Sequence, residues 1–150
     1  MADRGHAATR GDKSGRGNPM GKVLRGLILA AASVVLLAGC RSAPVRDVIN
    51  EPVVVTGEKQ ATLDDVERAI VRAGSALGWR MRPVAPGQME GTLNLRSHTA
   101  IVDIAYDTRT YSIKYKDSTN LGYDGTSIHS NYNGWIQNLD KGIQTQLVNL

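Results

Sequence analysis

The sequence predicts an α+β domain, and three observations support that prediction. After Thr62, apolar residues repeat with the 3.6-residue period of a helix. Four successive runs between residues 79 and 116 then alternate apolar and polar residues, which is the period of a strand. A second segment with helical spacing begins at residue 128. With one strand before the first helix, the expected order is β-α-β-β-β-β-α, an antiparallel meander sheet of four to five strands with two helices on one face.

The first helix is predicted to begin after Thr62 and to end at Gly78. Thr62 is a favourable N-cap, and Asp64, Asp65 and Glu67 place negative charge near the positive end of the helix dipole. Gly78 is typical of the residue that ends a helix. The apolar residues are three and four positions apart and therefore share one face: Leu63, Val66, Ile70, Ala73 and Leu77.

Strands are predicted on both sides of this helix. A β-branched run, Val53–Thr56, is followed by Gly57 and predicts the first strand. The meander is expected in four alternating runs joined by short connections: Trp79–Arg82, Met89–Arg96, Ala100–Tyr106 and Tyr111–Lys116.

The second helix is expected to cover the sheet near the C-terminus. Ser127 or Ser130 would cap it. Gly134 and Gly142 each cost a helix about 1 kcal/mol relative to alanine, so we expect this helix to lie close on the sheet. Its apolar residues follow helical spacing: Ile128, Tyr132, Trp135, Ile136, Leu139, Ile143 and Leu147.

The residues before the domain have the pattern of an export signal. The basic residues Lys22 and Arg25 precede an apolar run, Leu27–Leu37, which ends in the small residues before Cys40. A membrane-spanning helix needs about 20 apolar residues, and this run is too short. Residues 1–19 lack an apolar period, so they are either a disordered leader or the result of a start codon upstream of Met20.

The sequence Leu37-Ala38-Gly39-Cys40 resembles the lipobox of bacterial lipoproteins, in which the cysteine is acylated and becomes the mature N-terminus. The resemblance implies that residues 1–39 are a leader and a cleaved signal peptide, and that Cys40 carries palmitate and other acyl chains. It also implies a protein that is anchored in a bacterial membrane and faces the periplasm. Arg41 after the cysteine, where an aspartate would mark retention in the inner membrane, favours the outer membrane.

The remaining chain is expected to divide into a tether and one domain. Residues 40–52 have no clear period and contain Pro44 and Pro52, so they are interpreted as a lipidated tether. Residues 53–150 are expected to form a single α+β domain. Cys40 is the only cysteine, so this domain has no disulfide and depends on its core alone.

The charge of the chain is concentrated in the part that would be removed. The formal net charge is +4, from 18 basic and 14 acidic residues. Six of the basic and two of the acidic residues lie in residues 1–39, so residues 40–150 hold 12 of each and are neutral. A neutral domain offers no basic surface for nucleic acid, so no nucleic-acid partner is expected.

The polar residues of the segment 117–135 are the candidates for a binding surface. No His, Cys, Asp or Glu spacing matches a metal site, and no glutamate follows Glu90 to complete a calcium loop of the EF-hand type. The same residues could instead serve turn geometry, with Tyr132 and Trp135 in the core. The candidate residues are Asp117, Asn120, Tyr123, Asp124 and His129.

The C-terminal segment also resembles small bacterial lipoproteins of uncharacterised function. The matching residues lie in the run DSTNLGYDG and in the helix start IHSNYNGW, and they span about a quarter of the mature chain: Tyr115, Asp117, Ser118, Asn120, Leu121, Tyr123, Ile128, His129, Tyr132, Asn133 and Trp135. The resemblance implies no activity.

The expected function is therefore a lipid-anchored periplasmic binding or structural module that is not an enzyme and needs no cofactor or metal. Its expected partners are the membrane, through acylated Cys40, and an envelope protein or peptidoglycan. The alternative is an envelope hydrolase or glycan-binding enzyme that uses His129 with Asp117 or Asp124. Such an enzyme would need these side chains to converge on an enclosed cleft.

Overall fold

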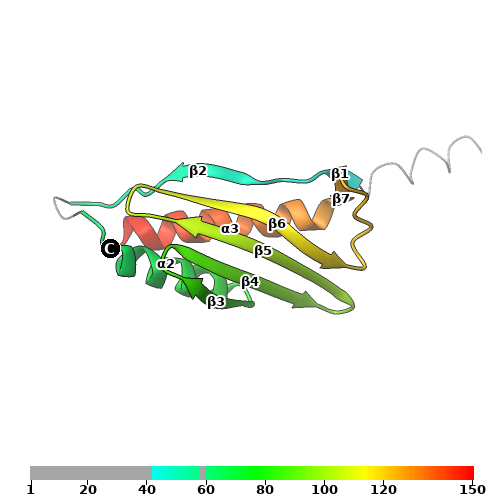
Figure 1. The fold of residues 1–150 in the computed structure, drawn as a ribbon, viewed down its shortest axis with the longest axis horizontal. Helices are drawn as coiled ribbons and strands as arrows, with labels where there is room; N and C mark the ends of the chain where they lie inside the picture. Colours follow the sequence, from blue (N-terminus) through cyan, green and yellow to red (C-terminus); the bar gives the residue numbers. More distant parts are fainter. Residues whose placement is uncertain (1–41, 58–59) are drawn as a thin grey trace, which may run out of the picture. The chain divides into compact units, whose positions relative to one another are not determined.

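The computed structural model describes residues 42–57 and 60–150 (Figure 1). Seven strands and two helices follow one another in these residues: β1 (Ser42–Pro44), β2 (Val48–Pro52), α2 (Leu63–Ala76), β3 (Trp79–Ala85), β4 (Gln88–Leu95), β5 (His98–Tyr106), β6 (Thr110–Thr119), β7 (Ser127–His129) and α3 (Ser130–Val148). The predicted leader, the predicted signal peptide and Cys40 lie outside the described residues.

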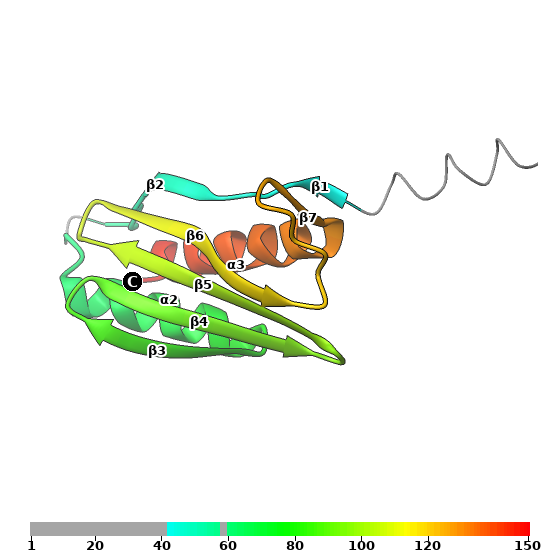
Figure 2. The ribbon, with the colours of Figure 1, turned by 45° about the vertical axis from the view of Figure 1, so that its right-hand side comes forward.

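The main sheet has five antiparallel strands in the order β2-β6-β5-β4-β3. Strands β3 to β6 are consecutive neighbours, as in the predicted meander, and Gly91 of β4 pairs with Val102 of β5. Both helices cover the same face of this sheet (Figures 1 and 2). Strands β1 and β7 form a separate two-stranded sheet. The α+β prediction, with a meander sheet and two helices on one face, is confirmed.

The core lies between the sheet and the two helices. The alternation predicted for the third run of the meander is confirmed, because Ala100, Val102, Ile104 and Tyr106 are all buried. The helical stripes supply the opposite wall of the core. The buried apolar residues of the two helices are Val66, Ala69, Ile70, Ala73, Tyr132, Ile136, Leu139, Ile143 and Leu147. Trp135 is partly buried and packs against this cluster.

Helix α2 begins where the sequence predicts. The Thr62 hydroxyl oxygen accepts a hydrogen bond from the Asp65 backbone N–H at 3.2 Å, and the Asp65 carboxylate accepts one from the Thr62 N–H at 3.0 Å. This reciprocal capping box satisfies two N–H groups that the helix cannot pair internally. The helix ends just before Gly78, whose φ of +84° favours glycine.

The segment interpreted as a tether belongs to the folded domain from Ser42 onwards. Strands β1 and β2 lie inside it, and Val48 is buried opposite Ile113 of β6. The run Val53–Thr56, predicted as the first strand, comes just after β2 and is not a strand. The sequence did not reveal β2 because this strand lies at the edge of the sheet, where proline and polar residues are tolerated and the apolar period is weak.

Helix α3 also begins differently from the prediction. Ser127 and Ile128 belong to β7, and the N-cap is His129 instead of a serine. The glycines of α3 differ from each other. A Cβ on Gly142 would lie 3.4 Å from Leu77 Cδ1 and 3.5 Å from Ala73 Cβ, so its close neighbour is α2 and the region just after it instead of the sheet.

Gly134→Ala is expected to stabilise the domain by about 1 kcal/mol. A Cβ at this position meets no atom within 4 Å, so the gain in helix propensity is not offset by a clash. Gly87→Ala is the matched control and should destabilise, because Gly87 has φ +75° and its Cβ would lie 2.7 Å from the Tyr106 carbonyl oxygen. Urea unfolding of both variants checks the prediction, and a loss of stability in Gly134→Ala would contradict it.

Candidate functional site

The candidate residues of the segment 117–135 gather at one end of the domain, which we call the β1 end. It consists of the β1–β7 pair, the turn 96–97 between β4 and β5, and the loop 120–126. These parts adjoin because Ser42 pairs with His129, and Thr99 at the start of β5 pairs with Thr119 at the end of β6. Figure 2 shows the β4–β5 turn and the loop before β7 reaching the same end as β1.

Asn120 ties the loop to the β4–β5 turn. Its backbone has φ 58°, and its side-chain Nδ2 donates to the Ser97 carbonyl oxygen at 2.7 Å. His98 Nδ1 lies 2.7 Å from the Asn120 carbonyl oxygen, an acceptor, so Nδ1 carries the proton in this contact. His98 is therefore part of the structure that holds the loop.

His129 holds the start of helix α3. The ring Nδ1 of His129 accepts a hydrogen bond from the Asn131 backbone N–H at 3.2 Å. The backbone N–H of His129 donates to the Leu121 carbonyl oxygen at 2.9 Å. Its ring centroid lies 6.3 Å from that of His98. Among the hydrogen bonds of the described residues, none joins His129 to Asp117 or Asp124.

Asp124 is held by its own turn, whereas Asp117 lies in strand β6. Asp124 Oδ1 accepts hydrogen bonds from the backbone N–H groups of Ser127 at 2.7 Å and Thr126 at 2.9 Å, and from the Thr126 hydroxyl at 3.1 Å. The Ser127 N–H, followed by the Thr126 groups, holds the pKa of the Asp124 carboxyl below its ordinary value. Asp117 Oδ1 accepts the N–H of Ser118 at 2.7 Å. These contacts give the Asp124 carboxylate a role in turn geometry, and the Asp117 carboxylate a contact with its neighbour in β6.

A row of tyrosine rings runs from the surface of the β1 end into the core. Tyr123 is 42 % exposed, and its ring centroid lies 4.2 Å from that of Tyr115. The Tyr115 ring in turn meets Tyr132 edge to face at 5.7 Å. The Tyr123 hydroxyl donates to the Gly125 carbonyl oxygen at 3.1 Å, which fixes the exposed ring over the loop. Tyr132 is fully buried.

A network of charges that sequence reasoning did not single out lies on the sheet face opposite the helices. Glu90 accepts from Arg82 at 2.8 Å and from Lys116 at 2.9 Å, and Lys116 also donates to Asp103 at 2.9 Å. The hydrogen bond from Arg82, then that from Lys116, lowers the pKa of Glu90 to about 2. One indication of this network was present in the sequence, because its charged residues are among the polar residues that alternate with apolar ones along the predicted strands. Each of these charges has a partner, so the network stabilises strand pairing.

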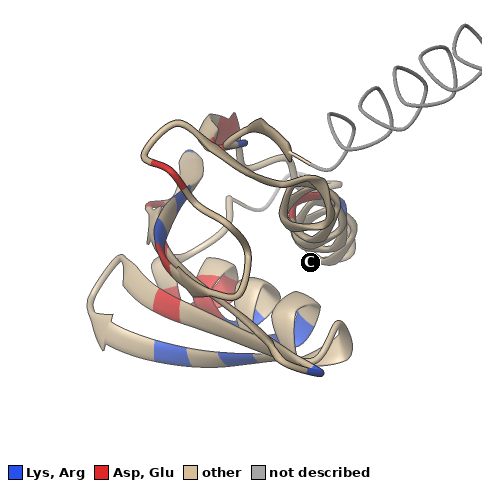
Figure 3. Cartoon of the chain, turned by 90° about the vertical axis from the view of Figure 1, so that its right-hand side faces the viewer, with Lys and Arg blue, Asp and Glu red and all other residues tan. Residues whose placement is uncertain are grey.

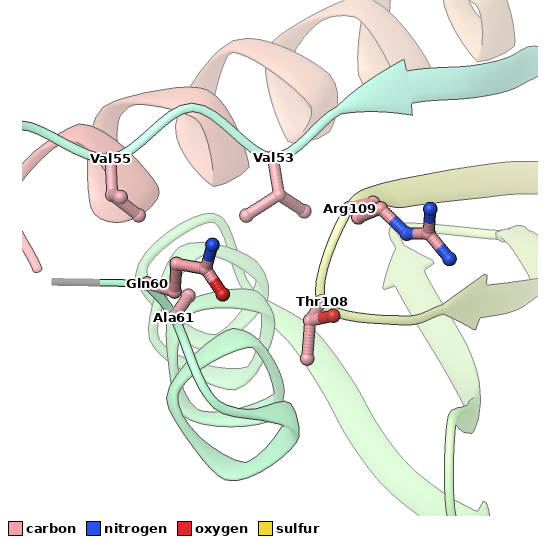
Figure 4. Close-up of a pocket in the computed structure, with 6 residues that line it drawn as sticks. All are labelled: Val53, Val55, Gln60, Ala61, Thr108 and Arg109. Atoms are coloured by element: carbon pink, nitrogen blue, oxygen red, sulfur yellow. The ribbon is translucent and has the colours of Figure 1, made fainter.

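A hollow of about 470 Å³ lies away from the candidate residues, between the segment after β2 and the β5–β6 turn (Figure 4). Val53, Val55 and Gln60 point into the space, whereas the guanidinium group of Arg109 points away from it. The remaining lining residues are Ala61 and Thr108. This lining offers no pair of ionisable groups for acid–base chemistry.

Three further findings concern metal binding, membrane-spanning helices and similarity to known proteins. Within residues 42–57 and 60–150, no group of three or more His, Cys, Asp or Glu side chains is placed to hold a metal ion. In the same residues no helix has the length and apolar character needed to cross a membrane. Comparisons of the chain with protein-family models, with curated proteins and with solved structures gave no match.

Proposed function

We propose that the protein is a bacterial envelope lipoprotein held in the membrane by acylated Cys40, with its α+β domain facing the periplasm as a binding or structural module. The observation that carries the proposal is the sequence before the domain, where a basic segment, a short apolar run and Leu37-Ala38-Gly39-Cys40 follow in order. Arg41 favours the outer membrane. The neutral charge of residues 40–150 supports a partner that is not nucleic acid.

A module that binds or supports, instead of an enzyme, is favoured by the contacts of the candidate residues. Asn120 and His129 fix the loop and the start of α3, and Asp124 accepts three hydrogen bonds from its own turn. A hydrolase would need an acid or base that is left available for substrate, as well as a reacting group within reach of it. The exposed Tyr123 ring fits contact with a protein or with peptidoglycan.

Cys40→Ala is expected to abolish acylation and membrane retention while leaving the domain folded. Acyl chains contribute about 0.8 kcal/mol of membrane binding per buried methylene, and a neutral domain has no basic patch to replace them. The measurement is incorporation of labelled palmitate, together with the membrane fraction after a salt wash. A chain whose residues 1–40 are replaced by a cleavable signal peptide serves as the control and should be released as a soluble periplasmic domain.

Palmitate incorporation into Cys40→Ala would contradict the anchor, and so would membrane retention of the control chain after the salt wash. The module is tested separately, by crosslinking in the intact envelope from a photoreactive residue at position 123. Reproducible capture of one envelope protein supports the module. Capture of glycan with cleavage of that glycan by the purified domain would instead establish the hydrolase alternative.

A further inference from the structure

The anchor cysteine and the folded domain are separated by very little chain. Cys40 is followed by Arg41 and then by Ser42, the first residue of β1. Fully extended, two residues span about 7 Å. Acyl chains on Cys40 would therefore hold the β1 end close to the membrane surface. This step rests on the acylation of Cys40 proposed above.

From Ser42 onwards the chain is fixed to the domain. Ser42 pairs with His129, and the Val45 N–H donates to the Thr126 carbonyl oxygen at 3.0 Å. Asn133 of α3 then clamps the next residues: its Oδ1 accepts the Arg46 N–H at 2.9 Å, and its Nδ2 donates to the Pro44 carbonyl oxygen at 2.8 Å. Because β1 is paired and clamped, it cannot serve as a flexible spacer.

We propose that the β4–β5 turn and the loop 120–126, called here the membrane-end loops, rest on the phospholipid headgroups of the leaflet that holds the acyl chains. Both loops adjoin β1 through the histidine pair, since His129 pairs with Ser42 and its ring lies 6.3 Å from His98. Tyr123 of the loop is 42 % exposed, and Leu95, the last residue of β4 before the turn, is 46 % exposed. Tyrosine rings and apolar side chains of this kind are favoured at the membrane–water interface.

The contact is set by the short connection instead of by charge. Figure 3 views the domain from this end, and the membrane-end loops carry one basic and one acidic residue, Arg96 and Asp124. Residues 40–150 are neutral as a whole, so anionic lipid gives no strong attraction. A connection of two residues instead keeps the loops at a high local concentration at the bilayer surface. The opposite end of the domain, about 30 Å away along the nine residues of β5, then faces the periplasm.

The test uses the fact that Cys40 is the only cysteine and is consumed by acylation. A cysteine introduced at an exposed site is then the single free thiol, and a fluorescent label on it reports one position. Ser97→Cys places the label in the β4–β5 turn, which is exposed. Val84→Cys is the matched control, because Val84 is 49 % exposed at the far end of β3. The full acylated protein is reconstituted in phosphatidylethanolamine–phosphatidylglycerol vesicles that contain a lipid with a nitroxide headgroup.

We expect quenching of the label at position 97 to be several-fold stronger than at position 84, and to persist at high salt. A third chain carries ten flexible Gly and Ser residues between Arg41 and Ser42, which adds a reach of about 17 Å. Quenching at position 97 should fall in that chain. Equal quenching at the two positions, or quenching at position 97 that the insertion leaves unchanged, would overturn the inference. Both results concern protein that is acylated and bound to vesicles, so they leave the proposed function intact. Absence of palmitate from the wild-type protein would overturn both proposals.

Discussion

Tyr111→Phe is expected to destabilise the domain by about 2 kcal/mol, although it removes a single oxygen atom. Tyr111 of β6 is 1 % exposed, and its hydroxyl donates to Asp140 Oδ1 of α3 at 2.6 Å. Asp140 is itself buried, with a further hydrogen bond from Gln144 at 3.2 Å. Burial and the neighbouring Asp140 carboxylate raise the pKa of Tyr111, so the hydroxyl stays protonated and donates. Loss of a buried hydrogen bond to a charged group costs about 1.5–3 kcal/mol.

The same substitution at Tyr132 provides the control. Tyr132 is 0 % exposed, and its hydroxyl has no hydrogen-bond partner within the described part of the chain. Phenylalanine keeps the ring and removes a buried hydroxyl that is already unsatisfied, so Tyr132→Phe should be neutral or stabilise by up to about 1 kcal/mol. Urea unfolding of the two variants gives the comparison. Because both variants keep the ring, equal changes of stability would show that the hydrogen bond from Tyr111 to Asp140 does not contribute to stability.

The sequence predicted those parts of the fold that depend on local spacing. Helix α2 has a capping residue, Thr62, directly before a regular apolar stripe, and both features act within a few residues. The meander also has a local signal, since each strand alternates and pairs with the next one along the chain. Helix α3 was predicted from its stripe, but its first turn was not, because the side chain of His129 took the capping role expected of a serine.

The partners of the candidate residues could not be predicted, because they lie far away in the sequence. The residue types in the loop were consistent with either binding or turn geometry, and only the fold brings Asn120 to Ser97 and His98. One signal was present. In an antiparallel hairpin the start of β5 must lie beside the end of β6, so the pairing register alone would have placed His98 near Asn120.

The interpretation of residues 40–52 as a tether failed for a similar reason. Strand β2 pairs with β6, whose partner residues lie 58 to 65 positions later in the chain, and it contributes one buried side chain, Val48, to the core. One buried apolar residue, followed by the exposed apolar Ile49, gives no periodic pattern to recognise. The evidence for the strand is its pairing with β6, where Val48 lies opposite Ile113. The local sequence of β2 does not reveal this pairing.

Val48→Asp is therefore expected to destabilise the domain by more than about 3 kcal/mol, whereas a residue in a tether would tolerate the change. Val48 is 6 % exposed opposite Ile113. Its burial contributes about 1.5–3 kcal/mol, and an aspartate at this position would also leave a carboxylate in the core without a partner. The loss of stability would be measured by urea unfolding, with circular dichroism as the readout.

Ile49→Asp is the control, because it introduces the same charge one residue later on the same strand. Ile49 is 55 % exposed, so an aspartate there stays in water. Its cost should not exceed about 1 kcal/mol, the span of strand propensities. A large difference in stability between these two variants would mean that the segment has a fixed inner side and a fixed outer side. A paired strand has such sides, and a tether does not. If both variants unfolded at the same urea concentration as the wild-type chain, residues 48–52 would be a tether in solution. The proposed contact of the β1 end with the membrane would then rest on β1 alone.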